Sequence, residues 1–293
     1  MIDLIMPTLS QGLLWALMAL GVYLTYRVLD IADLTVEGSF PLGAAVAAAI
    51  LVEGGSPFVA VLIAAIAGAL AGVVTGVLHT KLKIPALLAG ILTMIALYSV
   101  NLRVMGKANL SLLRVDTIFS LIRDYGFTNV QAILIVGVVS TLFFGFLMYW
   151  FFGTEIGAAI RATGFNQQMI RAQGIDTDVT IILGLLLSNA LVAVSGALIG
   201  QSSGFADVGM GTGTIVIGLA SVIIGEVLFG TKSFKNCLVS VVLGSVVYRF
   251  VIAIVLQLGM PPNDLKLFTS VLVVLALSMP LFKARFRSRK VAK

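Results

Sequence analysis

Uncharged apolar stretches follow one another along almost the whole chain, and their length is the strongest constraint on its fold. The first stretch, residues 4–26, carries no charged side chain. As a helix it is long enough to cross about 30 Å of hydrocarbon. Apolar residues make up 59% of the 293 positions and charged residues only 11%, whereas soluble domains average about 25% charged residues. The sequence therefore predicts an all-α polytopic membrane protein.

The hydropathy pattern predicts about nine transmembrane segments in a single transmembrane domain, residues 1–293. The second segment, residues 38–52, is shorter than the usual ~20 residues. We therefore expect it to be a broken or re-entrant helix packed within the protein. The predicted segments are residues 4–26, 38–52, 54–80, 84–102, 125–154, 179–201, 215–229, 237–256 and 267–282.

Lysine and arginine residues gather in alternate loops, and this asymmetry predicts the orientation. With nine crossings, thirteen of them share a side: Arg27, Lys81, Lys83, Arg161, Arg171, Lys232, Lys235 and six in the basic tail, residues 283–293. Five lie opposite: Arg103, Lys107, Arg114, Arg123 and Lys266. Because cytoplasmic loops are enriched in basic residues, we expect a multi-pass cell-membrane protein with its N-terminus outside and its C-terminus inside. A re-entrant second segment would change only the side of the N-terminus.

A polar segment, residues 153–178, interrupts two long apolar runs. Asn166 can cap a short helix over residues 167–173, and Gly174 suits the left-handed position after it. Residues 156–163 predict a second short helix that Gly164 would stop. Two capped helices in a loop are typical of a docking surface, and the alternative is an amphipathic hairpin lying on lipid headgroups.

Charged and amide side chains inside apolar segments are candidates for a solute path. Glu226 lies near the end of segment seven, where it could pair with Lys232 at the interface. Arg249 lies in the middle of segment eight, and we predict that it pairs with Glu226.

Three further candidates lie elsewhere, two of them between apolar segments and one inside a segment. Asp33 and Glu37 are one helical turn apart before the short second segment, where they could line a gate at an unwound half-helix or act as an ordinary cap. Asn189 lies deep in segment six, and a hydrogen bond to a neighbouring helix is the favoured interpretation of this amide over a solute contact.

Three stretches resemble one family of transporters. GAAIRATGFNQQMIRAQGIDTD, followed by a helix ending in VSGALIGQSSG, resembles the cytoplasmic coupling loop and next helix of ABC-importer permeases that carry branched-chain amino acids, ribose and related solutes. GLLWALMALGVYLTYRVLDIADLTVEGSFPLGA and LHTKLKIPALLAGILTM resemble two other parts of these permeases, in the same order. The DLTVEG stretch departs from the Asn-Phe-Ala pattern of branched-chain members and looks closer to a subgroup linked to aromatic amino acids.

The resemblance implies a permease that is not itself an enzyme. Its partners would be two copies of an ABC ATPase, a second permease copy forming a homodimer, an external solute-binding protein and membrane lipid. ATP and Mg²⁺ would be bound by the ATPase, because GEVLFGTKS misses the phosphate-loop spacing: Thr231 displaces Lys232 by one position. The residues expected to contact the ATPase are Thr163, Gly164, Phe165, Asn166, Gln167, Met169, Ile170, Arg171 and Gly174.

Two other functions remain open at this point. A proton-coupled secondary transporter would use Glu226 and Asp33 as proton carriers and would need no partner. An intramembrane enzyme is less favoured, because one histidine, His79, and one cysteine, Cys237, offer too few catalytic groups and predict no metal site. Clustering of basic residues in the tail also argues against nucleic-acid binding.

Overall fold

The structure is a computed structural model that describes residues 2–259, 261, 264, 267–275 and 278. This part of the chain holds seven apolar helical stretches long enough to cross a membrane and one shorter apolar helix, which confirms the all-α polytopic fold. The elements are α1 (Ile2–Tyr23), the π-helix η1 (Leu24–Val28), α2 (Val36–Val52), α3 (Pro57–Thr80), α4 (Ala86–Met105), β1 (Asn109–Ser111), α5 (Ile118–Arg123), α6 (Asn129–Phe151), α7 (Glu155–Phe165), α8 (Gln167–Ala172), α9 (Thr177–Ser203), β2 (Phe205–Asp207), the 3₁₀ helix η2 (Val208–Gly211), α10 (Thr214–Phe229) and α11 (Phe234–Gln257).

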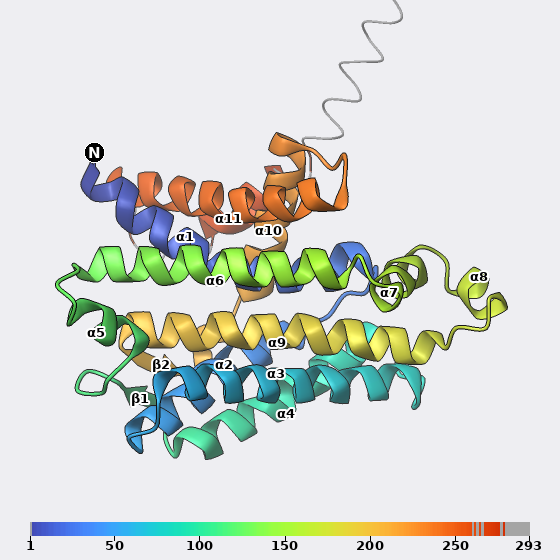
Figure 1. Ribbon diagram of the computed structural model, residues 1–293, viewed down its shortest axis with the longest axis horizontal. Coiled ribbons are helices and arrows are strands. Elements are labelled where there is room, and N and C mark those ends of the chain that lie inside the picture. The colour runs from blue at the N-terminus through green and yellow to red at the C-terminus, as the bar shows by residue number, and fades with distance from the viewer. Residues whose placement is uncertain (1, 260, 262–263, 265–266, 276–277, 279–293) are drawn as a thin grey trace, which may run out of the picture.

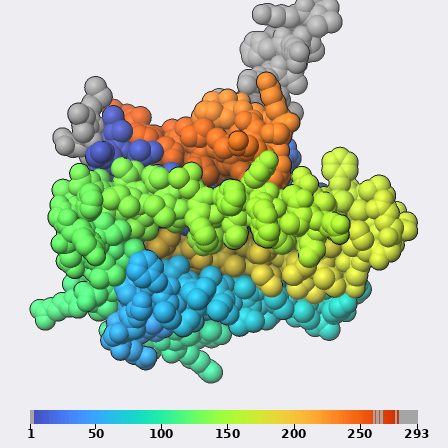
Figure 2. Space-filling model, in the orientation of Figure 1, coloured from blue at the N-terminus to red at the C-terminus, as the bar shows by residue number. Residues whose placement is uncertain are grey.

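The long helices run side by side between two different ends of the molecule (Figure 1). At one end, which we call the α8 end, α7 and α8 project beyond the other helices, as Figure 2 shows in yellow-green. The opposite end, which we call the β-ribbon end, carries α5 and the antiparallel pair β1–β2. The N-terminus lies at the β-ribbon end (Figure 1).

Helix α9 is the central helix of the bundle and packs against α1, α2 and α3. Small residues allow these close contacts. A side chain at Gly68 or Gly72 of α3 would collide with the α9 backbone at Asn189 or Leu185. In a membrane the hydrophobic effect does not drive helices together, and glycine allows the close van der Waals packing that does.

Two helices begin in the middle of the molecule. The Ser39 hydroxyl, in the first turn of α2, donates to Asn189 Oδ1 halfway along α9, at 2.6 Å. Helix α2 therefore runs only from the middle to the β-ribbon end, and the non-helical residues 29–35 connect it to η1. This is the short second segment that the sequence predicted.

Helix α10 is the second half-helix, and its start also lies in the middle of the molecule, beside Glu37. The chain turns inward after β2, and Gly213, the residue before α10, has φ of +84°, which glycine adopts without a steric penalty. From there α10 runs to the α8 end. The starts of α2 and α10 thus meet inside the bundle.

Several predicted boundaries need correction. The predicted loop 103–124 contains the last turn of α4, strand β1 and α5, whose start is fixed by a Thr117–Ser120 capping box. In the predicted ninth segment, residues 267–275 are helical. The rest of that segment, apart from Ser278, and the basic tail lie outside the described residues.

Candidate translocation path and coupling surface

A buried polar network surrounds the start of α2. Asp33 is only 3% exposed. One carboxylate oxygen accepts the Thr35 backbone N–H at 2.9 Å, and the other accepts the Asn189 amide at 2.8 Å. The Thr35 hydroxyl lies 2.7 Å from that of Thr75 on α3, which donates to Thr93 on α4 at 2.9 Å. The network therefore joins α2, α3, α4 and α9.

This network explains why the connecting segment 29–35 can cross the interior without helical structure. Asp33 and Asn189 supply hydrogen bonds that water would otherwise supply, and a buried polar group without a partner costs about 1–3 kcal/mol. Asn189 thus bonds to neighbouring elements, as the favoured interpretation predicted. Asp33 is brought to Asn189, and both oxygens of its carboxylate accept hydrogen bonds within the protein.

Glu37 connects the two half-helices. Its Oε1 accepts the backbone N–H of Gly213 at 3.0 Å, and the carboxylate thereby lies at the start of α10, where the helix dipole favours negative charge. Gly211 packs so closely against the Glu37 carbonyl that any side chain there would collide with it. Glu37 therefore holds the start of α10 against the start of α2.

A half-open cavity of about 420 Å³ lies beside Glu37, between α2, α4 and η2. It extends from the middle of the molecule toward the β-ribbon end, because its α4 lining runs from the middle of that helix, at Met94, to Asn101 near its end. Asn101 in its wall is buried and donates to the Gly38 carbonyl at 3.3 Å, while its Oδ1 accepts no hydrogen bond from the described residues. The lining residues are Glu37, Gly38, Pro41, Met94, Ile95, Tyr98, Ser99, Asn101, Val208, Gly209 and Thr212.

Glu226 pairs with Arg27, which corrects the predicted pairing with Arg249. Arg27 Nε lies 2.9 Å from Glu226 Oε1 at the α8 end. Glu226 is three residues before the end of α10, whereas Arg249 is 15 residues beyond the start of the antiparallel α11. At 1.5 Å per residue the two are separated by about 20 Å along the helix axes. The alternative partner Lys232 forms no ion pair with Glu226 in the described structure.

Arg249 instead lies against an aromatic ring. Its guanidinium carbon is 4.1 Å from the ring centre of Trp15, and this indole stacks on Phe40 of α2 at 5.2 Å. A cation over an indole face is stabilised by the ring quadrupole. Within the described part of the chain, Arg249 forms no salt bridge, and its Nε donates no hydrogen bond. The arginine is thus placed between α1 and α11, apart from Glu226.

Helix α7 is docked onto η1 and α9. Thr163 is buried, and its hydroxyl lies 2.8 Å from that of Thr180 on α9. Gly164 packs on the Val28 carbonyl so tightly that a Cβ would collide with it. The expectation that Gly164 stops this helix is wrong, because α7 continues to Phe165. Thr163 and Gly164 attach α7 to the bundle and do not face outward.

Helix α8 has the predicted cap at its start. Asn166 Oδ1 accepts the Met169 backbone N–H at 3.0 Å. The helix ends at Ala172, and Gly174 has φ of +84°. Ile170 is only 2% exposed, so the prediction that it offers an apolar contact to a partner is wrong. Its side chain anchors α8.

An ion cluster that sequence reasoning missed fixes α8 from the side. Asp178, at the start of α9, lies 3.1 Å from Lys81 Nζ, 3.9 Å from Lys83 Nζ and 3.7 Å from an Arg171 guanidinium nitrogen. The Arg171 Nε also donates to the Thr177 hydroxyl. Arg171 therefore bonds within the chain, and the α3–α4 loop is joined to α8 and α9. The predicted clustering of basic loops at one end was the only sequence signal for this contact.

Three exposed side chains stand out at the junction of α7 and α8. Phe165 is 95% exposed at the junction of α7 and α8, and Met169 is 47% exposed. Gln167 is also exposed. We call Phe165, Gln167 and Met169 the coupling surface. Aromatic residues and methionine are enriched in protein–protein interfaces, so an exposed Phe165 near an exposed Met169 is typical of such an interface.

Comparison with known proteins now identifies the family. Residues 4–277 match a family described as the permease component of the branched-chain amino acid transport system. The chain belongs to this permease family. A tyrosine transport system permease protein of Clostridioides difficile is 42% identical over 271 residues, 92% of this chain and 89% of that protein. The chain is thus a permease component of an ABC transporter.

More distant relatives extend the comparison. An uncharacterised protein of Rickettsia prowazekii is 34% identical over 94% of this chain and 97% of its own length. The autoinducer 2 import permease LsrC of Salmonella paratyphi B is 27% identical over 74% of this chain and 61% of its length. A solved ABC transporter of metal-chelate type in an inward-facing conformation aligns over 96% of this chain and 85% of that chain, with a TM-score of 0.50 and 14% identity. This last likeness concerns the fold alone.

Proposed function

We propose that this permease imports an amino acid with an aromatic side chain, using ATP hydrolysed by a separate subunit. The observation that carries the proposal is the 42% identity, over 92% of this chain, to a permease named for tyrosine transport. The DLTVEG stretch, which departs from the pattern of branched-chain members, supports an aromatic substrate over a branched-chain one.

The solute path runs through the meeting point of the two half-helices. The cavity beside Glu37 opens in the half of the molecule toward the β-ribbon end, where an external binding protein would deliver the solute. The Glu37 carboxylate and the Asn101 amide oxygen are hydrogen-bond acceptors, and acceptors suit the ammonium group of an amino acid. Arg249 and Glu226 lie away from this cavity and have structural roles.

Energy enters at the α8 end. The coupling surface contacts one of two ATPase copies, each of which binds ATP and Mg²⁺, and a second copy of this chain completes the membrane part. In this arrangement the α8 end is cytoplasmic and the N-terminus is external. Two features support a force-transmitting contact: α8 is capped by Asn166, and Asp178 joins it to the α3–α4 loop through Lys81.

Substrate competition tests the proposed solute. The chain is reconstituted in liposomes with its co-purifying ATPase and the binding protein, and uptake of labelled tyrosine is measured against unlabelled competitors. We expect tyrosine and phenylalanine to reduce uptake strongly, leucine to reduce it weakly and ribose to leave it unchanged. Absence of tyrosine uptake, together with uptake of ribose, would overturn the proposal.

A pair of matched substitutions tests the coupling surface. Phe165→Asp replaces its main apolar contact with a charge, and we expect the amount of co-purified ATPase to fall at least ten-fold. Leu113→Asp is the control, because Leu113 is 86% exposed at the β-ribbon end. Equal ATPase recovery from both variants would show that α7 and α8 are not the docking site.

A further inference from the structure

A long apolar groove lies on the outside of the bundle, between α1, α6 and α11. Its volume is about 370 Å³, and almost all of its lining atoms are apolar. Gly145 forms part of the floor, and a Cβ built there meets no atom within 4 Å. The groove is lined by Leu20, Thr141, Leu142, Gly145, Phe146, Tyr149, Lys235, Leu238, Val239, Val242 and Leu243.

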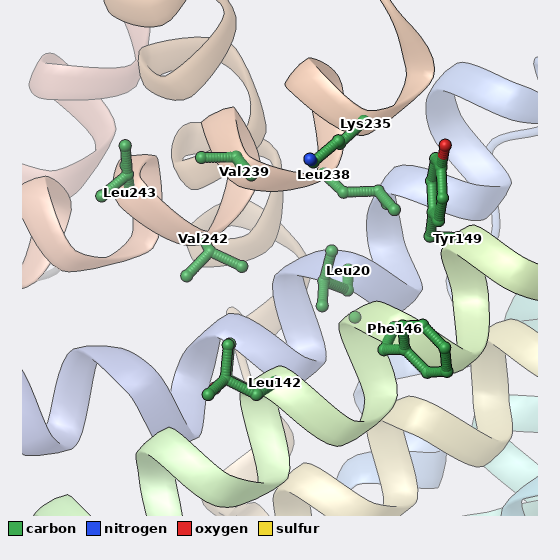
Figure 3. A pocket seen from close by; sticks show the side chains of 11 residues that line it. Leu20, Leu142, Phe146, Tyr149, Lys235, Leu238, Val239, Val242 and Leu243 are labelled. Atoms are coloured by element: carbon green, nitrogen blue, oxygen red, sulfur yellow. The ribbon is translucent and has the colours of Figure 1, made fainter.

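The polar groups of the groove are confined to one end. Figure 3 shows the Lys235 amine and the Tyr149 hydroxyl at one end, and Leu142 and Leu243 toward the other. Lys235 is the second residue of α11 and Tyr149 lies two residues before the end of α6, so both are at the α8 end. The Thr141 hydroxyl, at the apolar end, donates to the Leu13 carbonyl at 3.0 Å and offers its proton to no ligand.

The length of the groove matches one leaflet of a membrane. Lys235 and Leu243 are eight residues apart on α11, which corresponds to about 12 Å of helix. Half of the hydrocarbon thickness is about 15 Å. The lysine and tyrosine therefore lie at the level of lipid headgroups, where tyrosine is enriched, and the apolar end lies near the bilayer centre.

We propose that this groove binds one anionic phospholipid from the leaflet at the α8 end. An acyl chain would lie against Leu142, Phe146 and Val242, and the phosphate would accept hydrogen bonds from the Lys235 amine and the Tyr149 hydroxyl. Charge complementarity selects this occupant, because a cation at the headgroup end of an apolar groove favours an anionic lipid over a zwitterionic one. The site is independent of the transported solute.

Native mass spectrometry of the purified full chain tests the site with phosphatidylglycerol and phosphatidylcholine carrying identical acyl chains. We expect the wild-type chain to bind one phosphatidylglycerol about five-fold more tightly than phosphatidylcholine, the factor given by one lysine near an anionic headgroup. Lys235→Gln should remove this preference. Lys232→Gln is the matched control, because Lys232 is exposed at the same end but does not line the groove.

A second pair of variants tests the acyl position. Gly145→Phe fills the groove and should weaken binding of both lipids at least five-fold, whereas Val139→Phe adds the same ring to an exposed site of α6 outside the groove. An unchanged lipid preference in Lys235→Gln would overturn the proposal. So would a Gly145→Phe variant that loses a dimer but keeps its lipid, because the groove would then be a subunit interface.

Discussion

At the scale of single residues, the positions of the charges follow from packing between helices that are far apart in the sequence. The Glu226 side chain is 14% exposed, and its partner Arg27 comes from the end of η1, almost 200 residues earlier. The Arg249 guanidinium instead lies over the aromatic ring of Trp15 and has no carboxylate partner among the described residues. Both arrangements lower the cost of a charge within a membrane protein.

A double-mutant cycle tests the Arg27–Glu226 pair. Arg27→Ala and Glu226→Ala should each lower the melting temperature in detergent, and the double variant should lose less than the sum, with a coupling of about 0.5–1 kcal/mol because Arg27 is largely exposed. The cycle between Glu226 and Arg249 is the control and should be additive. Coupling in the control cycle, but none between Arg27 and Glu226, would refute the pair.

At the scale of elements, helix α7 contacts the π-helix η1 backbone to backbone at the α8 end. Gly164 lies directly on the Val28 carbonyl, so we expect movement of α7 to be accompanied by movement of η1. Gly174, by contrast, has no atom within 4 Å of an added Cβ, and only its positive φ requires glycine. Substitutions at Gly164 therefore test the contact between α7 and the bundle, whereas substitutions at Gly174 test only local backbone strain.

Alanine at each glycine should therefore give different results. Gly164→Ala inserts a methyl group into a backbone contact and should cost about 1–3 kcal/mol and uncouple ATP hydrolysis from transport. Gly174→Ala places a non-glycine residue in the left-handed region and should cost about 1–2 kcal/mol while leaving coupling intact. The melting temperature and substrate-stimulated ATPase activity are measured for both. Normal coupling in Gly164→Ala would show that the α7 contact does not transmit force.

The sequence predicts some elements of this molecule much better than others, for physical reasons. The positions of the apolar segments in the described part of the chain, the short α2 and the Asn166 cap depend on local patterns of apolar and capping residues, and they agree with the structure to within a few residues at each end. The inward turn before α10 and the Asp178 cluster depend on residues distant in the sequence, which no local pattern contains. The burial of Ile170 could not be predicted for the same reason, because the sequence of a six-residue helix does not indicate which of its faces packs against the bundle.

At the scale of the whole molecule, the two half-helices place non-helical chain at the centre and leave two chemically different ends. Residues 29–35 reach the middle from the α8 end, and the chain after β2 reaches it from the β-ribbon end. Non-helical backbone at membrane depth is tolerated where protein or a water-filled cavity satisfies it. The buried network around Asp33 and the cavity beside Glu37 meet this requirement.

Accessibility at the two ends tests the proposed orientation. In a Cys237→Ser background, Leu113→Cys and Phe165→Cys place thiols at highly exposed sites of the β-ribbon and α8 ends. A membrane-impermeant maleimide added to intact cells should label Leu113→Cys and should label Phe165→Cys only after the cells are opened. The reverse pattern would invert the molecule in the membrane.

Measuring which energy source drives uptake tests directly whether this permease moves its solute only with an ATPase. Uptake of labelled tyrosine is measured in liposomes that contain the chain alone or with its ATPase, with ATP on the ATPase side or with a pH gradient. We predict uptake only with the ATPase and ATP, and none with an ATPase variant that cannot hydrolyse ATP. Uptake by the chain alone on a pH gradient would show that the ATPase is not required and would identify a proton-coupled transporter.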